Sequence, residues 1–131
     1  MNDRELLELA AKAAELPECG WMGPSFMYVK NNTFTDWSPL TDDGDALRLA
    51  VNLDMIVKVD RVDGYTKVIF GYSVGMICNE THGSDPYAAT RRAIVRAAAE
   101  VGKGIKQPAP IDLLEDNYYK SQAEAFEKGM K

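Results

Sequence analysis

Residues 55–74 decide the fold: Met-Ile-Val-Lys-Val-Asp-Arg-Val-Asp-Gly-Tyr-Thr-Lys-Val-Ile-Phe-Gly-Tyr-Ser-Val. In residues 55–60 apolar and charged side chains alternate, which predicts a half-buried strand. Asp63-Gly64 is a hairpin turn signal. Beyond the turn, apolar side chains recur at every second position and predict a return strand that runs as far as Cys78. Two strands joined by so short a turn must be antiparallel.

Amphipathic segments flank this hairpin on both sides. Apolar spacing predicts helices over residues 3–16, 43–52 and 86–102, and a short aromatic run predicts a strand over 26–29. Residues 17–25 hold several Pro and Gly residues and predict irregular structure.

Acidic residues explain two of the helix starts. Asp3 is expected to cap the first helix, and Thr41 or Asp42 the second, with Asp43 and Asp45 in its positive first turn. In this second helix the spacing predicts that the buried side chains are Leu47, Ala50 and Val51. The last of the three helices is rich in alanine, with Ser84 or Asp85 as its cap, and is expected to lie flat on the hairpin.

The order of these elements indicates an α+β fold. An antiparallel, β-hairpin-based sheet covered by α-helices, an α-β-α sandwich, is the expected architecture, with a further C-terminal helix. The sandwich domain is assigned to residues 1–106. A Pro-rich joint then leads into a helical extension over 107–131, whose helix is predicted at 111–128 with Ile111, Leu114, Tyr118, Ala125 and Phe126 on one side.

Composition narrows the classes of function. The chain has 131 residues and a formal net charge of -5. Because nucleic-acid binding draws on many basic groups, the acidic balance argues against general nucleic-acid binding. No stretch approaches the roughly 20 apolar residues that cross a bilayer, so no membrane association is expected. Cys19 and Cys78 show no metal-ligand spacing and are expected to be free thiols.

Three segments carry a resemblance to a known family. They are Asn2–Ala14, Trp37–Val51 and Asp85–Glu100, which together frame about the first 103 residues. In these segments the chain resembles the phage ABA sandwich domain family of small phage and prophage proteins. The resemblance implies an α-β-α sandwich and a bacteriophage or prophage gene, acting in the host bacterial cytoplasm. It implies no catalytic residues, because the family has no agreed activity.

The basic residues of the alanine-rich helix are candidates for a ligand site. Arg91, Arg92 and Arg96, with His82 in the preceding loop, could bind a nucleotide phosphate or another small anion. The alternative is a solvated and partly paired helix face with an exposed loop histidine. Convergence of the arginines in one cavity would favour ligand capture, whereas dispersed arginines beside an exposed apolar patch would favour a partner-binding surface.

Aromatic residues outside the predicted elements are candidates for an interface. Trp21 and Phe34 lie in loop-like sequence, and Tyr118-Tyr119 lies on the predicted last helix. Such residues would fit a homo-oligomer seam or a surface for a bacterial host protein; core packing is the competing explanation.

No catalytic set and no metal site emerge from the motifs. Asp42-Asp43-Gly44-Asp45 fails the calcium-loop pattern, and the helix cap explains it. No phosphate loop or nucleophile elbow is present, and no cofactor is expected. The leading expectation is a non-enzymatic phage accessory protein that binds a host protein or small ligand, such as a counter-defence inhibitor. The alternatives are a protein that sequesters or hydrolyses a nucleotide-like anion, and a phage structural or assembly component.

Overall fold

The computed structural model describes residues 1–70 and 76–104. The chain forms, in order, α1 (Asp3–Ala14), β1 (Gly20–Met22), β2 (Ser25–Lys30), β3 (Thr33–Asp36), α2 (Asp43–Asn52), β4 (Ile56–Asp60), β5 (Tyr65–Phe70), β6 (Met76–Thr81) and α3 (Pro86–Gly104). The predicted extension over 107–131, with Tyr118 and Tyr119, lies outside the described residues.

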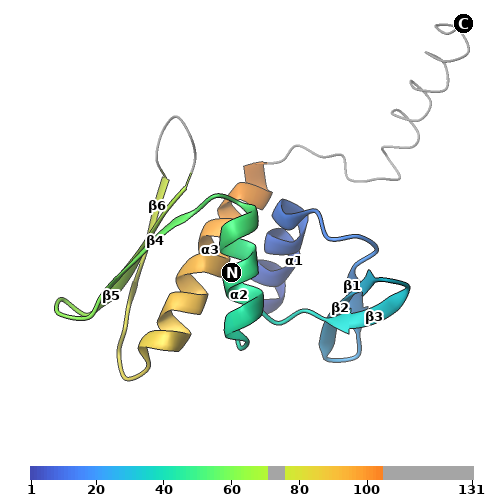
Figure 1. Cartoon of the computed structure of the whole chain (residues 1–131), viewed down its shortest axis with the longest axis horizontal. Helices are drawn as coiled ribbons and strands as arrows, with labels where there is room; N and C mark the ends of the chain where they lie inside the picture. Colours follow the sequence, from blue (N-terminus) through green and yellow to red (C-terminus); the bar gives the residue numbers. More distant parts are fainter. Residues whose placement is uncertain (71–75, 105–131) are drawn as a thin grey trace, which may run out of the picture.

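The predicted α+β class, with antiparallel sheet and covering helices, is confirmed. One sheet has the order β1-β2-β3 and the other β4-β5-β6, and all their pairings are antiparallel. Figure 1 shows α3 beside the β4–β6 sheet, with α1 on the other side of α3, α2 drawn in front of α3, and the small β1–β3 sheet beyond α1. The helices therefore cover one face of the β4–β6 sheet, which we call the inner face.

The return strand of the hairpin ends earlier than predicted. β5 stops at Phe70, and β6 runs back beside it, with Val68 opposite Cys78 and Tyr65 opposite Thr81. The prediction of one strand from the turn to Cys78 was wrong. Two strands of a hairpin keep the same period-two alternation, so the pattern did not reveal that the chain reverses between them.

The small sheet was mostly missed. β1 lies inside the segment predicted to be irregular, and β3 follows the turn at Asn31-Asn32. Both strands pair with β2, the one strand that local sequence predicted. Gly23, at a φ of 66°, supplies the left-handed turn between β1 and β2. A Gly- and Pro-rich segment can thus become a strand when a neighbour satisfies its backbone groups.

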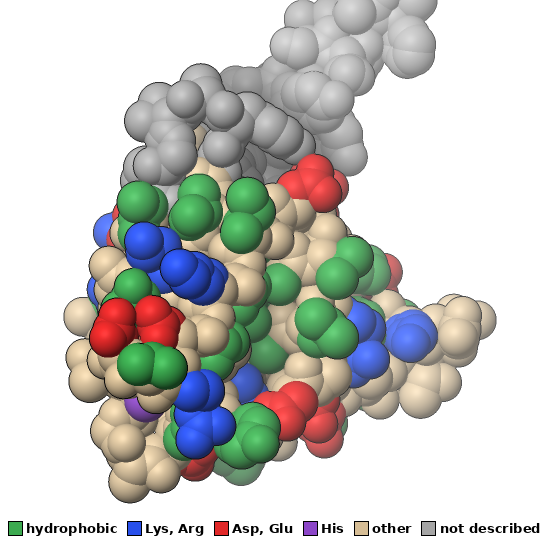
Figure 2. Space-filling model, turned by 60° about the vertical axis from the view of Figure 1, so that its left-hand side comes forward, with side chains coloured by type: hydrophobic (Ala, Val, Ile, Leu, Met, Phe, Trp, Pro, Cys, Tyr) green, Lys and Arg blue, Asp and Glu red, His purple; other side chains and the backbone are tan. Residues whose placement is uncertain are grey.

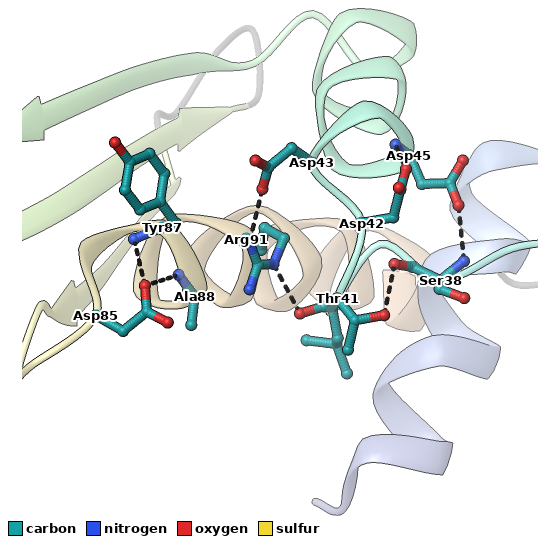
Figure 3. Close-up of polar contacts among 10 residues, drawn as sticks. Ser38, Thr41, Asp42, Asp43, Asp45, Asp85, Tyr87, Ala88 and Arg91 are labelled. Carbon is teal, nitrogen blue, oxygen red and sulfur yellow. Dashed lines mark hydrogen bonds and ion pairs between the residues drawn. The ribbon is translucent and has the colours of Figure 1, made fainter.

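Side-chain caps start the helices. Asn2, rather than the predicted Asp3, caps α1: its side chain accepts from the Glu5 amide at 2.9 Å, and Glu5 accepts from the Asn2 amide in return. The predicted caps of the other helices are confirmed. Asp42 accepts from the Asp45 amide at 2.8 Å, and Asp85 accepts from the amides of Tyr87 and Ala88 (Figure 3).

The core is centred on α3. Its buried alanines lie on β5 and β6, as predicted, and also on α1. The approach of α3 to α1 is so close that a Cβ added at Gly102 would lie 2.0 Å from the Leu9 carbonyl oxygen. Only glycine fits at this crossing.

In α2 the buried side differs from the prediction. Ala46, Leu49 and Ala50 are buried, whereas Leu47 and Val51 are 62% and 66% exposed. Leu47 and Val51 therefore form a separate apolar stripe that faces away from the core.

None of the described helices combines the length and apolar character needed to cross a membrane.

Candidate functional site: an apolar groove

An open groove lies between α2, β4 and α3, with a volume of about 340 Å³. We call it the apolar groove. It is lined by Asp43, Ala46, Leu47, Val57, Val59, Arg61, Pro86, Tyr87, Thr90, Arg91 and Ile94. Figure 2 shows hydrophobic side chains along a hollow in the middle of this face, with acidic and basic side chains near its lower end.

The groove exists because β4 is an edge strand that the helices cover incompletely. Val57 and Val59 lie opposite Val68 and Thr66 of β5, so all four side chains point to the inner face of the sheet. Val68 and Thr66 are fully buried beneath α3, whereas Val59 is exposed. The gap between β4 and α2 leaves Val59, Leu47 and Tyr87 accessible together, although each is large enough to occupy a core.

Arg91 forms part of the groove wall and holds it in place. Its Nε donates to the Leu40 carbonyl at 2.9 Å, and its Nη1 donates to Asp43 at 2.6 Å (Figure 3). These bonds tie α3 to the N-terminal end of α2. Arg61 is exposed at the opposite wall and forms no ion pair with any residue in the described ranges.

A buried polar chain runs from the floor of the groove through the core. Thr90 lines the groove, and its hydroxyl lies 2.7 Å from that of Thr66, which in turn lies 2.8 Å from Nε2 of His82. Thr66 is fully buried and His82 is 8% exposed. The expectation of an exposed loop histidine was therefore wrong. His82 is buried against Thr66, which lies 16 residues away along the chain, and local sequence does not show this contact.

The predicted ligand-binding arginines do not converge. Arg92 pairs with Asp3 of α1 at 2.9 Å, and Arg96 pairs with Glu80 of β6 and also donates to the Asn79 carbonyl. Arg91, Arg92 and Arg96 thus each bind a carboxylate on a different element. Of the four predicted ligand residues, only His82 and Arg92 share a cavity, a depression of about 270 Å³ beside the loop before α3.

The two described interface candidates lie on the small sheet. Trp21 donates from Nε1 to Glu8 at 2.8 Å, its ring lies 3.9 Å from the Arg4 guanidinium carbon, and it packs edge-on against Phe26. Trp21 is therefore largely engaged within its own chain. Phe34 is 61% exposed on β3, and both residues border a shallow depression of about 280 Å³.

The residues that define the groove were missed. Leu47 was predicted to be buried, and Val59 was predicted only as one side of a half-buried strand. The sequence of α2 did contain a signal for a second apolar side. Leu47 and Val51 form an apolar stripe that lies on a different side of the helix from Ala46 and Leu49. Placing this stripe opposite β4 requires the tertiary packing of α2.

The remaining candidate groups are the metal-ligating side chains and the two cysteines. Within residues 1–70 and 76–104, no three His, Cys, Asp or Glu side chains gather as they would around a metal ion. Cys19 and Cys78 are free thiols, as predicted; Cys19 is exposed and Cys78 buried. Burial raises the pKa of the Cys78 thiol, and the nearby Arg96 opposes this shift only in part.

Comparisons of this chain with protein-family models, with curated proteins and with solved structures gave no match.

Proposed function

We propose that the chain is a non-enzymatic binding protein that takes an apolar segment of a partner protein in the apolar groove. One observation carries this proposal: Leu47, Val59 and Tyr87 line one groove and are all exposed, Tyr87 by 67%. A monomeric protein gains nothing in folding from such an arrangement, and apolar side chains that gather in a groove are typical of interaction sites.

The distribution of charge supports a protein partner over a small anion. Arg91, Arg92 and Arg96 are each engaged by a carboxylate on another element, so none offers a free guanidinium to a phosphate. Arg61 at the rim of the groove remains open to an acidic group of the partner. The family resemblance supports a bacteriophage or prophage protein, and with it a bacterial host protein as partner.

The test compares two aspartate variants in a pull-down from bacterial lysate. Leu47→Asp places a charge in the groove, whereas Val62→Asp does so in the exposed turn after β4, where Val62 is 94% exposed. We expect a partner to be retained by the wild type and by Val62→Asp and to be lost with Leu47→Asp. Equal retention by both variants would contradict the proposal.

Native mass spectrometry of the purified chain tests the alternative. A retained mass of nucleotide size that is lost in Arg92→Ala would favour sequestration of an anion at the depression shared by His82 and Arg92. A spectrum of the bare chain, whether monomer or oligomer, leaves the binding of a protein partner as the function.

A further inference from the structure

The second face of the β4–β6 sheet, which we call the outer face, is apolar at one end. Ile56, Ile69 and Ile77 lie directly opposite one another across the three strands and point away from α3. Ile56 is 61% exposed and Ile77 54% exposed. Figure 2 shows hydrophobic and basic side chains on this side of the molecule, to the left of the groove, with acidic side chains among them. A row of three β-branched side chains across a sheet is typical of a covered face.

Next to this row the outer face carries two lysines. Lys58 and Lys67 lie directly opposite each other on neighbouring strands. Like charges in that position are destabilising. Neither lysine forms an ion pair within the described part of the chain. The pKa of Asp60, next along the same face from Lys58, is lowered mainly by hydrogen bonds from the backbone amides of Asp63 and Val62 and to a smaller extent by Lys58. The outer face therefore suits an apolar partner that brings carboxylates.

The residues that follow α3 have this chemistry. Residues 111–126 contain four carboxylates against one lysine. The helix predicted there would gather Ile111, Leu114, Tyr118, Ala125 and Phe126 on one side.

The chain leaves α3 at the correct end of the sheet. Arg96 binds the Asn79 carbonyl, so the middle of α3 lies level with the C-terminal half of β6. α3 then runs about 12 Å further to Gly104, toward the end of the sheet that holds Ile77 (Figure 1). Packed layers lie about 10 Å apart. Residues 105–110, which extend to about 20 Å, are long enough to pass from the layer of α3 to the outer face.

We propose that residues 111–126 bind the outer face of the sheet of their own chain, with their apolar side on Ile56, Ile69 and Ile77. Asp112 and Glu115, which border that side of the predicted helix, would then lie near Lys58 and Lys67. This contact would give the sheet a second helical layer. It is independent of the apolar groove, which lies on the inner side of β4, so either proposal can fail without the other.

Thiol labelling of the full-length chain tests this contact. In a Cys19→Ser, Cys78→Ala background, Ile77→Cys supplies one thiol on the outer face. We expect Leu114→Glu to raise the labelling rate of residue 77 at least fivefold. The matched control is Leu113→Glu, because the predicted helix places Leu113 on the opposite side, and it should leave the rate unchanged.

Three outcomes would overturn the proposal. Equal rates for the two glutamate variants would show that residues 111–126 do not cover Ile77. If Leu114→Glu raised the labelling rate of Leu47→Cys and left that of Ile77→Cys unchanged, the segment would lie in the apolar groove. A rate at residue 77 that rises on dilution of the protein would show that a second copy supplies the segment. Lys67→Glu provides a second supporting variant and should also raise the rate at residue 77, because it repels the carboxylates.

Discussion

Replacing Gly102 by alanine tests the close approach of α3 to α1. The added Cβ would lie 2.0 Å from the Leu9 carbonyl oxygen and 2.8 Å from the Leu9 carbonyl carbon, whereas Cβ contacts below 3.0 Å essentially never occur. Since both atoms belong to the backbone of α1, no side-chain rotation can relieve the contact. The two helices must separate by about 1 Å, which forfeits a quarter to a half of the dispersion energy of the atom pairs along the α1–α3 seam.

The expected cost follows from two opposing terms. Overpacking of this kind costs about 3 kcal/mol, and the better helix propensity of alanine returns about 1 kcal/mol. Gly102→Ala should therefore lower the free energy of unfolding by about 2 kcal/mol and the melting temperature by roughly 6–10 °C.

Urea denaturation followed by circular dichroism measures this change. Gly104→Ala is the matched control, because a Cβ at Gly104 meets no atom within 4 Å, and it should leave stability unchanged or slightly higher. The reasoning is refuted if Gly102→Ala is as stable as the wild type.

Two further predictions concern buried groups. Thr66→Val keeps the shape of the side chain but leaves His82 and Thr90 without their shared partner. It should therefore lower the free energy of unfolding, measured by urea denaturation, by about 1–3 kcal/mol. An unchanged urea midpoint would show that the polar chain contributes nothing to stability. At pH 8 a thiol reagent should modify Cys19 well before Cys78, and Cys78 only on unfolding. Desolvation raises the pKa of both thiols, so the difference follows from access, because Cys19 is exposed and Cys78 is buried. If mass spectrometry of the native protein showed both thiols modified at the same rate, this prediction would be wrong.

Elements whose start or turn is marked by a strong local sequence signal were predicted correctly. The turn at Asp63-Gly64 and the caps at Asp42 and Asp85 depend on residues within three positions of each other, and the structure has them where the sequence predicted. β1 and β3 depend instead on pairing with β2, so their own composition pointed to loops.

The site was harder to predict because it depends on contacts between distant segments. Arg91 could be read as a free cation until the structure placed Asp43, 48 residues away, against its guanidinium. Leu47 is apolar at a helical position, which usually indicates burial. Its exposure follows from the incomplete cover of β4, a property of the whole fold rather than of α2.

The central place of α3 also determines when the molecule can fold during synthesis. α1, α2, β5 and β6 all precede α3 in the chain, and all of them pack against it. A nascent chain that ends before Pro86 carries two helices and several strands whose apolar sides have no common surface on which to close. The part of the core that these elements share with α3 can therefore close only after the ribosome has released α3 from its exit tunnel.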